Sequence, residues 1–154
     1  MFLVKLTDKM LVYNYFKNLK NKKTKKLEHI KSENKYLYFC EYNDLTSHQI
    51  IDLKLSLKNK NIGFYFIKNK LLHSNYNLKG KGSLFVLYFE KFEDFYQINK
   101  ILSKIQKITP LSICYNNTLY SIYKLKQLKQ SSILPYILKN QLTLFKQKLV
   151  QIQI

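Results

Sequence analysis

Apolar residues along the chain fall into short runs that have the length of β-strands. Residues 36–42 are rich in aromatic side chains, residues 62–67 form a second apolar run, and residues 83–89 form a third. The run at 83–89 is apolar on both faces, which predicts a strand in the interior of a sheet. Residues 111–115 and 118–120 resemble two further short strands.

The first helical pattern lies at the N-terminus. Thr7 or Asp8 has the residue type that caps a helix, and apolar residues follow at the spacing of one helical face. These apolar residues are Val12, Tyr15, Phe16 and Leu19. Lysine is so frequent in residues 17–35 that the first part of this segment is too charged to pack, and we expect an exposed loop or a frayed helix end there.

Further helical patterns alternate with the strands. Their positions are 48–60, 69–72, 95–105, 121–129 and from Ser131 or Ser132 onward. Thr46 or Ser47 is placed to cap the first of them. Glu93 and Asp94 put acids at the start of the third, where the helix dipole is positive. In the last helix we expect Pro135 in the first turn.

This order of elements predicts an α/β fold with a mixed sheet of about four to five strands flanked by helices and an appended C-terminal helix. We expect residues 1–130 to form the α/β domain and residues 131–154 to form a C-terminal helical extension.

The net charge of the chain indicates its kind of partner more clearly than any motif does. Lysine and arginine total 27 against 9 acids, which gives a formal net charge of +18, and the acids end at Asp94. An anionic polymer explains such an excess better than a generic solubilising lysine surface does. The chain also lacks Arg, Ala and Trp, which indicates an A/T-rich genome such as that of an organelle. Part of the lysine excess then reflects codon bias.

Catalytic chemistry has little support in the sequence. The histidines, His29, His48 and His73, lack the short spacing to one another or to cysteine that metal sites use. The segment at residues 80–83 resembles a phosphate loop, but it precedes a strand instead of joining a strand to a helix. Cys40 and Cys114 are expected to be buried thiols. We therefore expect no enzyme, cofactor, metal or small-molecule substrate. No apolar stretch has the length of a membrane span.

A basic face is the stronger candidate for a site. Lys54 and Lys58 lie one turn apart on the expected helix at 48–60. Lys68 and Lys70 flank Asn69 at a junction between a strand and a helix, where backbone N–H groups can also point at phosphate. Each side chain alone is as compatible with simple solvation, and together they predict an RNA-binding face.

These residues and their order resemble the large-subunit ribosomal stalk-base protein family, called protein ten in bacteria and P-zero in archaea and eukaryotes. The resemblance rests on residues 39–46, on residues 66–72 with their Lys-Asn element after a strand, on the glycine-containing loop and apolar strand at 80–88, and on the acidic pair Glu93 and Asp94. It starts at the first helix and runs to about residue 128. Asn43 and Asp44 depart from the Arg-Gly of the family's turn, and Lys70 stands where Thr is usual.

The resemblance implies a structural constituent of the large ribosomal subunit that binds rRNA at the GTPase-associated region and forms the base of the stalk, in this case in a mitochondrion. The implied RNA-binding residues are Lys5, Lys9, Thr46, Gln49, Lys54, Lys58, Lys68, Asn69 and Lys70. In the family a long C-terminal helix holds dimers of the acidic stalk protein. Here residues 135–154 are short for that helix, which is therefore truncated, supplied by another protein or reduced to one docking site. The residues expected at such a site are Leu138, Leu142, Phe145 and Leu149. An alternative is a small basic accessory subunit of an organellar membrane complex, docked through this amphipathic C-terminal helix.

Overall fold

The computed structural model describes the backbone of residues 2–128 and 130–152, and the side chains of residue 10 and of residues 12–128 and 132–152. The chain divides into two compact units, Met1–Asn34 and Lys35–Ile154. The elements are α1 (Phe2–Glu33), β1 (Tyr36–Tyr42), α2 (Ser47–Lys58), β2 (Gly63–Ile67), α3 (Asn69–Tyr76), β3 (Ser83–Phe89), α4 (Glu93–Leu102), β4 (Ile108–Tyr115), β5 (Thr118–Ser121), α5 (Ile122–Lys126) and α6 (Gln130–Ile152).

The first unit is the single long helix α1. It begins at Phe2, so the expected cap at Thr7 or Asp8 is wrong. The lysine-rich segment, expected as a loop or a frayed end, continues the same helix to Glu33. Lysine is a good helix former, and no glycine or proline interrupts α1. The charge of the lysines therefore keeps the segment exposed without breaking the helix. The His29 and Glu33 side chains lie 3.4 Å apart across one turn.

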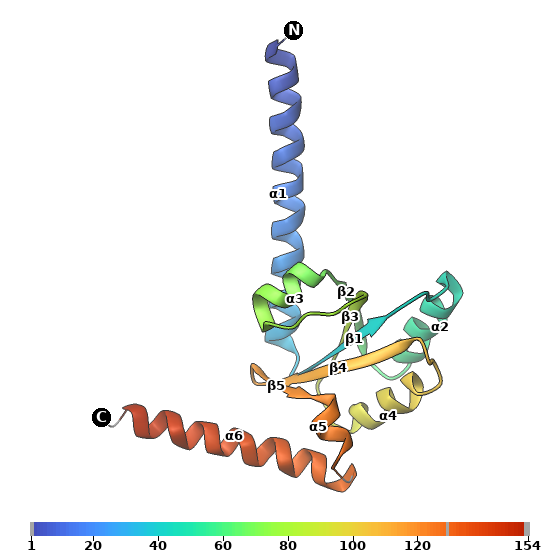
Figure 1. Cartoon of the computed structure of the whole chain (residues 1–154), viewed down its shortest axis with the longest axis vertical. Helices are drawn as coiled ribbons and strands as arrows, with labels where there is room; N and C mark the ends of the chain where they lie inside the picture. Colours follow the sequence, from blue (N-terminus) through green and yellow to red (C-terminus); the bar gives the residue numbers. More distant parts are fainter. Residues whose placement is uncertain (1, 129, 153–154) are drawn as a thin grey trace. The chain divides into compact units, whose positions relative to one another are not determined.

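The second unit is built on a five-stranded sheet with the order β2-β3-β1-β4-β5 (Figure 1). The α/β class, the number of strands and the flanking helices are confirmed. Every pairing in this sheet is antiparallel, whereas we expected mixed directions. Helix α2 joins β1 to β2. These two strands do run parallel to each other, but β3 lies between them in the sheet. The strands joined by α4 are separated by β1 in the same way.

Two boundaries differ from expectation for local reasons. β4 begins at Ile108, before Pro110, because the register shifts between Phe39 and Cys40 and leaves a bulge that accommodates the proline. α3 continues beyond Leu72 to Tyr76 and ends at Asn77, which has a left-handed φ of 52°. The predicted interior strand at 83–89 is confirmed as β3.

Helices cover both faces of the sheet within this unit. On one face Tyr38, Phe85 and Leu87 pack with buried residues of α2, α4, α5 and the first part of α6. The Tyr38 hydroxyl donates a 2.8 Å hydrogen bond to Asn99 Oδ1 of α4. On the other face the rings of Phe39 and Tyr76, a residue of α3, lie 4.8 Å apart.

Asparagine and aspartate make the tight turns of this glycine-poor chain. The left-handed backbone positions are Asp44, Asn61, Asn77, Asn116 and Asn117. These two residue types tolerate positive φ better than other side chains do. The adjacent pair at 116–117 closes the hairpin between β4 and β5.

The two cysteines are buried, as expected. Burial raises the pKa of the Cys40 thiol well above its usual value. Among the helices that the structure describes, none combines the length and the apolar character needed to cross a bilayer.

Helix α6 begins at Gln130, slightly earlier than expected, and Pro135 therefore lies inside the helix. Ile133 and Ile137 are buried in the core of the second unit. Gln141 Nε2 donates a 2.7 Å hydrogen bond to the Tyr120 hydroxyl. The described side chains after Gln141 are all exposed, so the first half of α6 is anchored and its second half projects from the sheet (Figure 1).

Candidate nucleic-acid interface

The segments in which the sequence predicts a basic site lie at one end of the sheet. Tyr42, at the end of β1, is opposite both Ser83 and Ile108, the first residues of β3 and β4. Ile67, at the end of β2, pairs with Leu84. The start of α2, the start of α3 and the loop before β3 therefore meet at this end of the sheet.

Asn69 joins two of these segments. Its Nδ2 donates to the carbonyl oxygen of Gly80 at 2.9 Å and to that of Gly82 at 3.4 Å, and its Oδ1 accepts from the Gly80 N–H at 3.0 Å. We expected this amide to reach a base or a phosphate. In the structure both ends of the amide fasten the loop before β3 to the first residue of α3.

The two glycines of that loop are needed for close approach. A Cβ added to Gly80 would lie 2.5 Å from Leu84 Cδ2. A Cβ added to Gly82 would lie 2.3 Å from Asn43 Oδ1, at the turn after β1. The glycines that superficially resembled a phosphate loop therefore let this loop pack tightly against its neighbours.

Four lysines flank the bonded residues: Lys68 and Lys70 beside Asn69, and Lys79 and Lys81 beside Gly80. We call these four residues the lysine cluster. All four side chains are exposed, and none forms an ion pair with the described part of the chain. Sequence reasoning identified Lys68 and Lys70 and missed the other two. The Lys-Gly-Lys-Gly pattern at residues 79–82 was the available signal.

Thr46 and Gln49 lie at the same end and form a reciprocal capping box. The Gln49 N–H donates to Thr46 Oγ1 at 3.3 Å, and the Thr46 N–H donates to Gln49 Oε1 at 3.0 Å. Thr46, one of the two candidates, is therefore the cap of α2. Nearby, Lys107 Nζ donates to the carbonyl oxygen of Asp44 at 2.8 Å.

The first of the two α2 lysines, Lys54, lies over the edge strand β2. Helix α2 starts at the basic end of the sheet and leads toward Gly63, which pairs with Tyr88 near the opposite end. Lys54 Nζ lies 4.9 Å and 5.2 Å from the ring centroids of Phe66 and Phe64 on the edge strand β2. Lys58 is exposed one turn further on. The side chains of Lys5 and Lys9 lie outside the described residues, and their role stays a prediction.

The acidic residues at the start of α4 stabilise this helix through its dipole. Glu93 and Asp94 occupy its first turn, as the sequence suggested. Among the described residues, no group of three or more His, Cys, Asp or Glu side chains is arranged to hold a metal ion.

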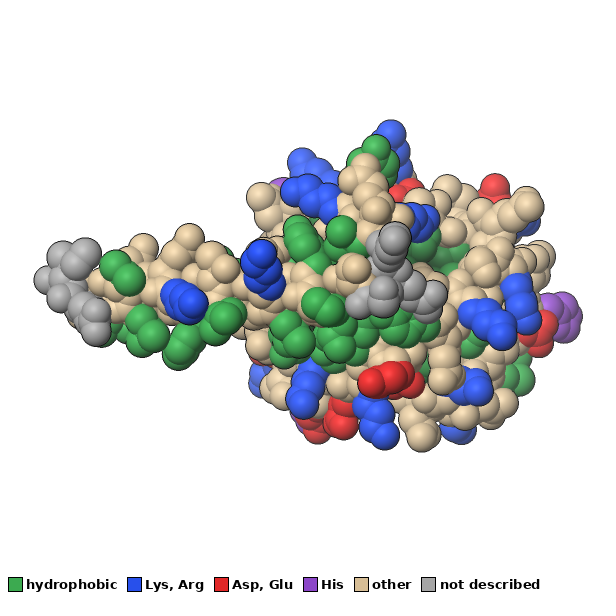
Figure 2. All heavy atoms as spheres, turned by 90° about the horizontal axis from the view of Figure 1, so that it is seen from below, with side chains coloured by type: hydrophobic (Ala, Val, Ile, Leu, Met, Phe, Trp, Pro, Cys, Tyr) green, Lys and Arg blue, Asp and Glu red, His purple; other side chains and the backbone are tan. Residues whose placement is uncertain are grey.

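The exposed face of α6 carries the second predicted surface. Leu138, Leu142, Phe145 and Leu149 are 48%, 55%, 60% and 45% exposed. Their spacing places them on one helical face. Figure 2 shows apolar side chains gathered along this helix, with lysines between them.

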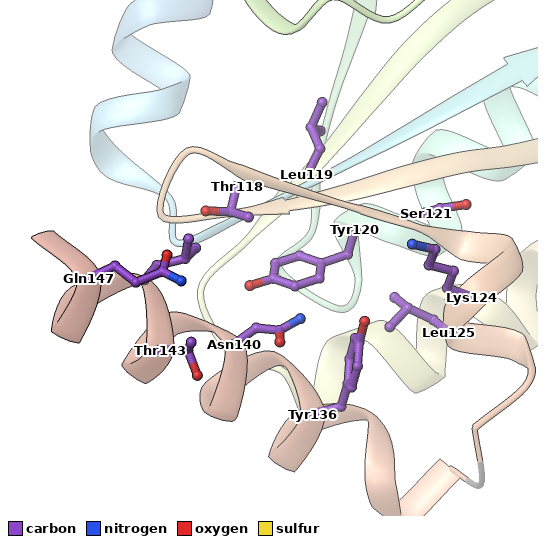
Figure 3. A pocket seen from close by; sticks show the side chains of 11 residues that line it. Thr118, Leu119, Tyr120, Ser121, Lys124, Leu125, Tyr136, Asn140, Thr143 and Gln147 are labelled. Carbon is purple, nitrogen blue, oxygen red and sulfur yellow. The ribbon is translucent and has the colours of Figure 1, made fainter.

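A groove of about 430 Å³ separates α6 from β5. Tyr120 and Asn140 point into it from the two sides, and Tyr136 and Lys124 close one end (Figure 3). Strand β5 is at the edge of the sheet, so the groove runs beside a strand edge that is unpaired within the described sheet.

The fold and the basic sheet end define a small, strongly basic α/β protein without a recognisable centre for covalent chemistry among the described residues. A sequence-family model described as Ribosomal protein L10 matches residues 16–107, which is more than half of the chain. The chain belongs to the ribosomal protein L10 family. A comparison with curated protein sequences gave no match.

Family membership confirms the resemblance and gives the general role. The protein is a structural component of the large ribosomal subunit at the stalk base. The matched segment contains Thr46, Gln49, the two α2 lysines and the lysine cluster, whereas Lys5, Lys9 and α6 lie outside it. This assignment favours the ribosomal interpretation over a subunit of a membrane complex.

Proposed function

We propose that the protein binds large-subunit rRNA at the GTPase-associated region through the basic end of its sheet. The observation that carries the proposal is the lysine cluster, four exposed ammonium groups without an acidic partner among the described residues. A backbone phosphate supplies the missing negative charge. Thr46, Gln49 and the α2 lysines belong to the same proposed face, and Asn69 lies within it.

The function is positional, with no covalent step. Lysines that neutralise phosphates release condensed counterions, so affinity falls with salt by a logarithmic slope of about 0.7–0.9 for each phosphate. The sheet supplies rigidity, because the segments that bear the lysines are fixed to the ends of paired strands. Binding would thus hold the stalk base at one place on the RNA.

The test measures binding of the whole protein to an rRNA fragment of this region across a salt series. The variant Lys68→Gln/Lys70→Gln removes two cluster charges. The matched control, Lys35→Gln/Lys91→Gln, removes two exposed charges at the opposite end of the sheet, where Tyr36 pairs with Phe89. We expect the cluster variant to lower the slope by about 1.5 and the control to leave it nearly unchanged. Salt-insensitive binding, or equal slopes for the two variants, would refute the proposal.

We also propose that the protein functions in a mitochondrion and is encoded there. The support is the lack of Arg, Ala and Trp beside abundant Lys, Asn, Ile, Leu, Tyr and Phe. The expected result is co-sedimentation of the chain with the large subunits of mitochondrial ribosomes. Recovery from cytosolic ribosomes or from membranes alone would contradict this location.

The exposed face of α6 is the proposed docking site for acidic stalk-protein dimers. Residues 95–154 contain lysines and no acids, so this part of the chain complements a negatively charged partner. The residues proposed for this contact are Leu138, Leu142, Phe145 and Leu149.

The docking test uses Leu142→Gln/Phe145→Gln. Each apolar side chain contributes about 1.5–3 kcal/mol when fully buried, so loss of both weakens docking by at least about 100-fold. Val150→Gln, which changes an exposed residue away from this face, is the control. Binding is measured by titration with the stalk dimer, and unchanged affinity of the double variant would exclude this docking face.

A further inference from the structure

We propose that Asn69 is a positioning residue that makes Lys79 and Lys81 part of the RNA-binding surface. It does so by fastening the loop at residues 79–82 to the start of α3, beside Lys68 and Lys70. The inference rests on the proposed RNA binding and goes further, because it explains how Lys79 and Lys81 join Lys68 and Lys70 and assigns Asn69 a role that involves no contact with RNA.

The hydrogen bonds of Asn69 are the first line of support. One side-chain amide both donates to and accepts from Gly80, and it adds a weaker bond to Gly82. The bonded residues are 11 and 13 positions away in the chain. Asn75, on the same helix, bonds only the Leu71 carbonyl oxygen one turn back in the hydrogen bonds of the described residues. Asn69 is thus a tertiary link, and Asn75 is a local one.

The loop requires such a link. Residues 77–82 form neither helix nor strand, so no ladder of backbone hydrogen bonds holds them in place. Lys79 and Lys81 bring positive charge toward Lys68 and Lys70, and like charges repel. The amide bonds oppose that repulsion in the free protein. Bound phosphates would remove this repulsion. Before RNA binds, the hydrogen bonds of Asn69 hold the lysine cluster together.

The glycines fit the same arrangement. The loop passes so close to Leu84 and to the turn at Asn43 that a side chain at Gly80 or Gly82 would force the Leu84 or Asn43 side chain to move. Gly80, the residue between Lys79 and Lys81, is the one that Asn69 bonds, so loss of this anchor would free both lysines. The lysine cluster is therefore one surface assembled from two segments, and Asn69 is the joint between them.

An Asn69 that reads RNA directly would behave differently. Its donor and its acceptor are already satisfied by the Gly80 backbone, and a base contact would have to break those bonds. On the positioning model, removal of the amide matters only while Lys79 and Lys81 are present. On the direct-contact model, the loss is independent of those lysines.

The experiment is a double-mutant cycle in RNA binding across a salt series. The variants are Asn69→Ala, Lys79→Gln/Lys81→Gln and their combination, with Asn75→Ala as the control. We expect the lysine variant to lower the salt slope by about 1.5, Asn69→Ala to lower it part of the way, and the combination to match the lysine variant. An unchanged slope in the lysine variant, or an additive further loss in the combination, would overturn the proposal.

Hydrogen exchange gives a readout that is independent of RNA. The Gly80 amide should exchange faster in Asn69→Ala and at the native rate in Asn75→Ala. If denaturation shows that Asn69→Ala is unfolded, Asn69→Ser replaces it in the cycle, since the shorter side chain removes the Nδ2 donor without adding a charge. Failure of the underlying RNA proposal is distinguishable, because wild-type binding would then lack salt dependence or Lys68→Gln/Lys70→Gln would behave as its control.

Discussion

The capping box at the start of α2 allows a sharp test, because Thr46 and Gln49 are both structural residues and proposed RNA contacts. Thr46→Ala removes the oxygen that accepts from the Gln49 N–H. Thr46→Ser keeps that oxygen. Gln49→Ala removes the acceptor of the reciprocal bond from the Thr46 N–H. Stability of the free protein therefore reports the cap alone, and RNA binding by the folded variants reports the contact.

The geometry sets the size of the effect. Loss of a capping hydroxyl costs about 0.5–2 kcal/mol, and the exposed, 3.3 Å bond to Thr46 Oγ1 places this cap near the middle of that range, at about 1 kcal/mol. The shorter 3.0 Å bond to Gln49 adds a contribution of similar kind. Because the two bonds support each other, we expect a coupling energy of about 0.5 kcal/mol between them.

The assay is urea denaturation of wild type, both single variants and the double variant. Thr46→Ala should lower the midpoint with an unchanged slope, and Thr46→Ser should retain most of the stability. Ser47→Ala, an exposed residue in the first turn of α2, is the control and should change stability by less than about 0.5 kcal/mol. Wild-type stability in Thr46→Ala, or equal losses in the Ala and Ser variants, would refute the capping role.

Two further predictions concern the core. Leu53→Ala should cost about 2–5 kcal/mol of unfolding free energy, whereas Leu55→Ala, 54% exposed on the same helix, should cost far less; similar midpoints in urea would contradict the packing of α2. Burial raises the pKa of Tyr36 from 10 to about 12, so the unfolded chain ionises first and stability should fall as pH rises from 10 to 12. Urea midpoints measured over this range should fall less steeply in Tyr36→Phe, and an identical decline in both proteins would remove Tyr36 as a cause.

Residue type and order predicted one part of the candidate site. Lys68 and Lys70 follow from a lysine-rich junction after a strand, and the structure leaves both exposed. The hydrogen bonds of Asn69 were not predicted, because a contact with a loop 11 residues away is invisible in the local sequence. Lys79 and Lys81 were not predicted for the same reason, because Gly80 between them contacts Asn69 only in the tertiary structure.

Sequence patterns by themselves determined the strands at 36–42 and 83–89 and the acidic start of α4, and they narrowed the cap of α2 to two residues, since each feature depends on neighbours a few residues apart. They also determined the charge. Only the tertiary structure decided that β3 lies between β1 and β2, and that all strand pairs are consequently antiparallel. Strand order depends on which apolar faces pack together across the whole second unit, and spacing along the chain does not encode it. That arrangement brings the ends of β1 and β2 and the starts of β3 and β4 to one end of the sheet. Lysines that are dispersed in the sequence lie together there.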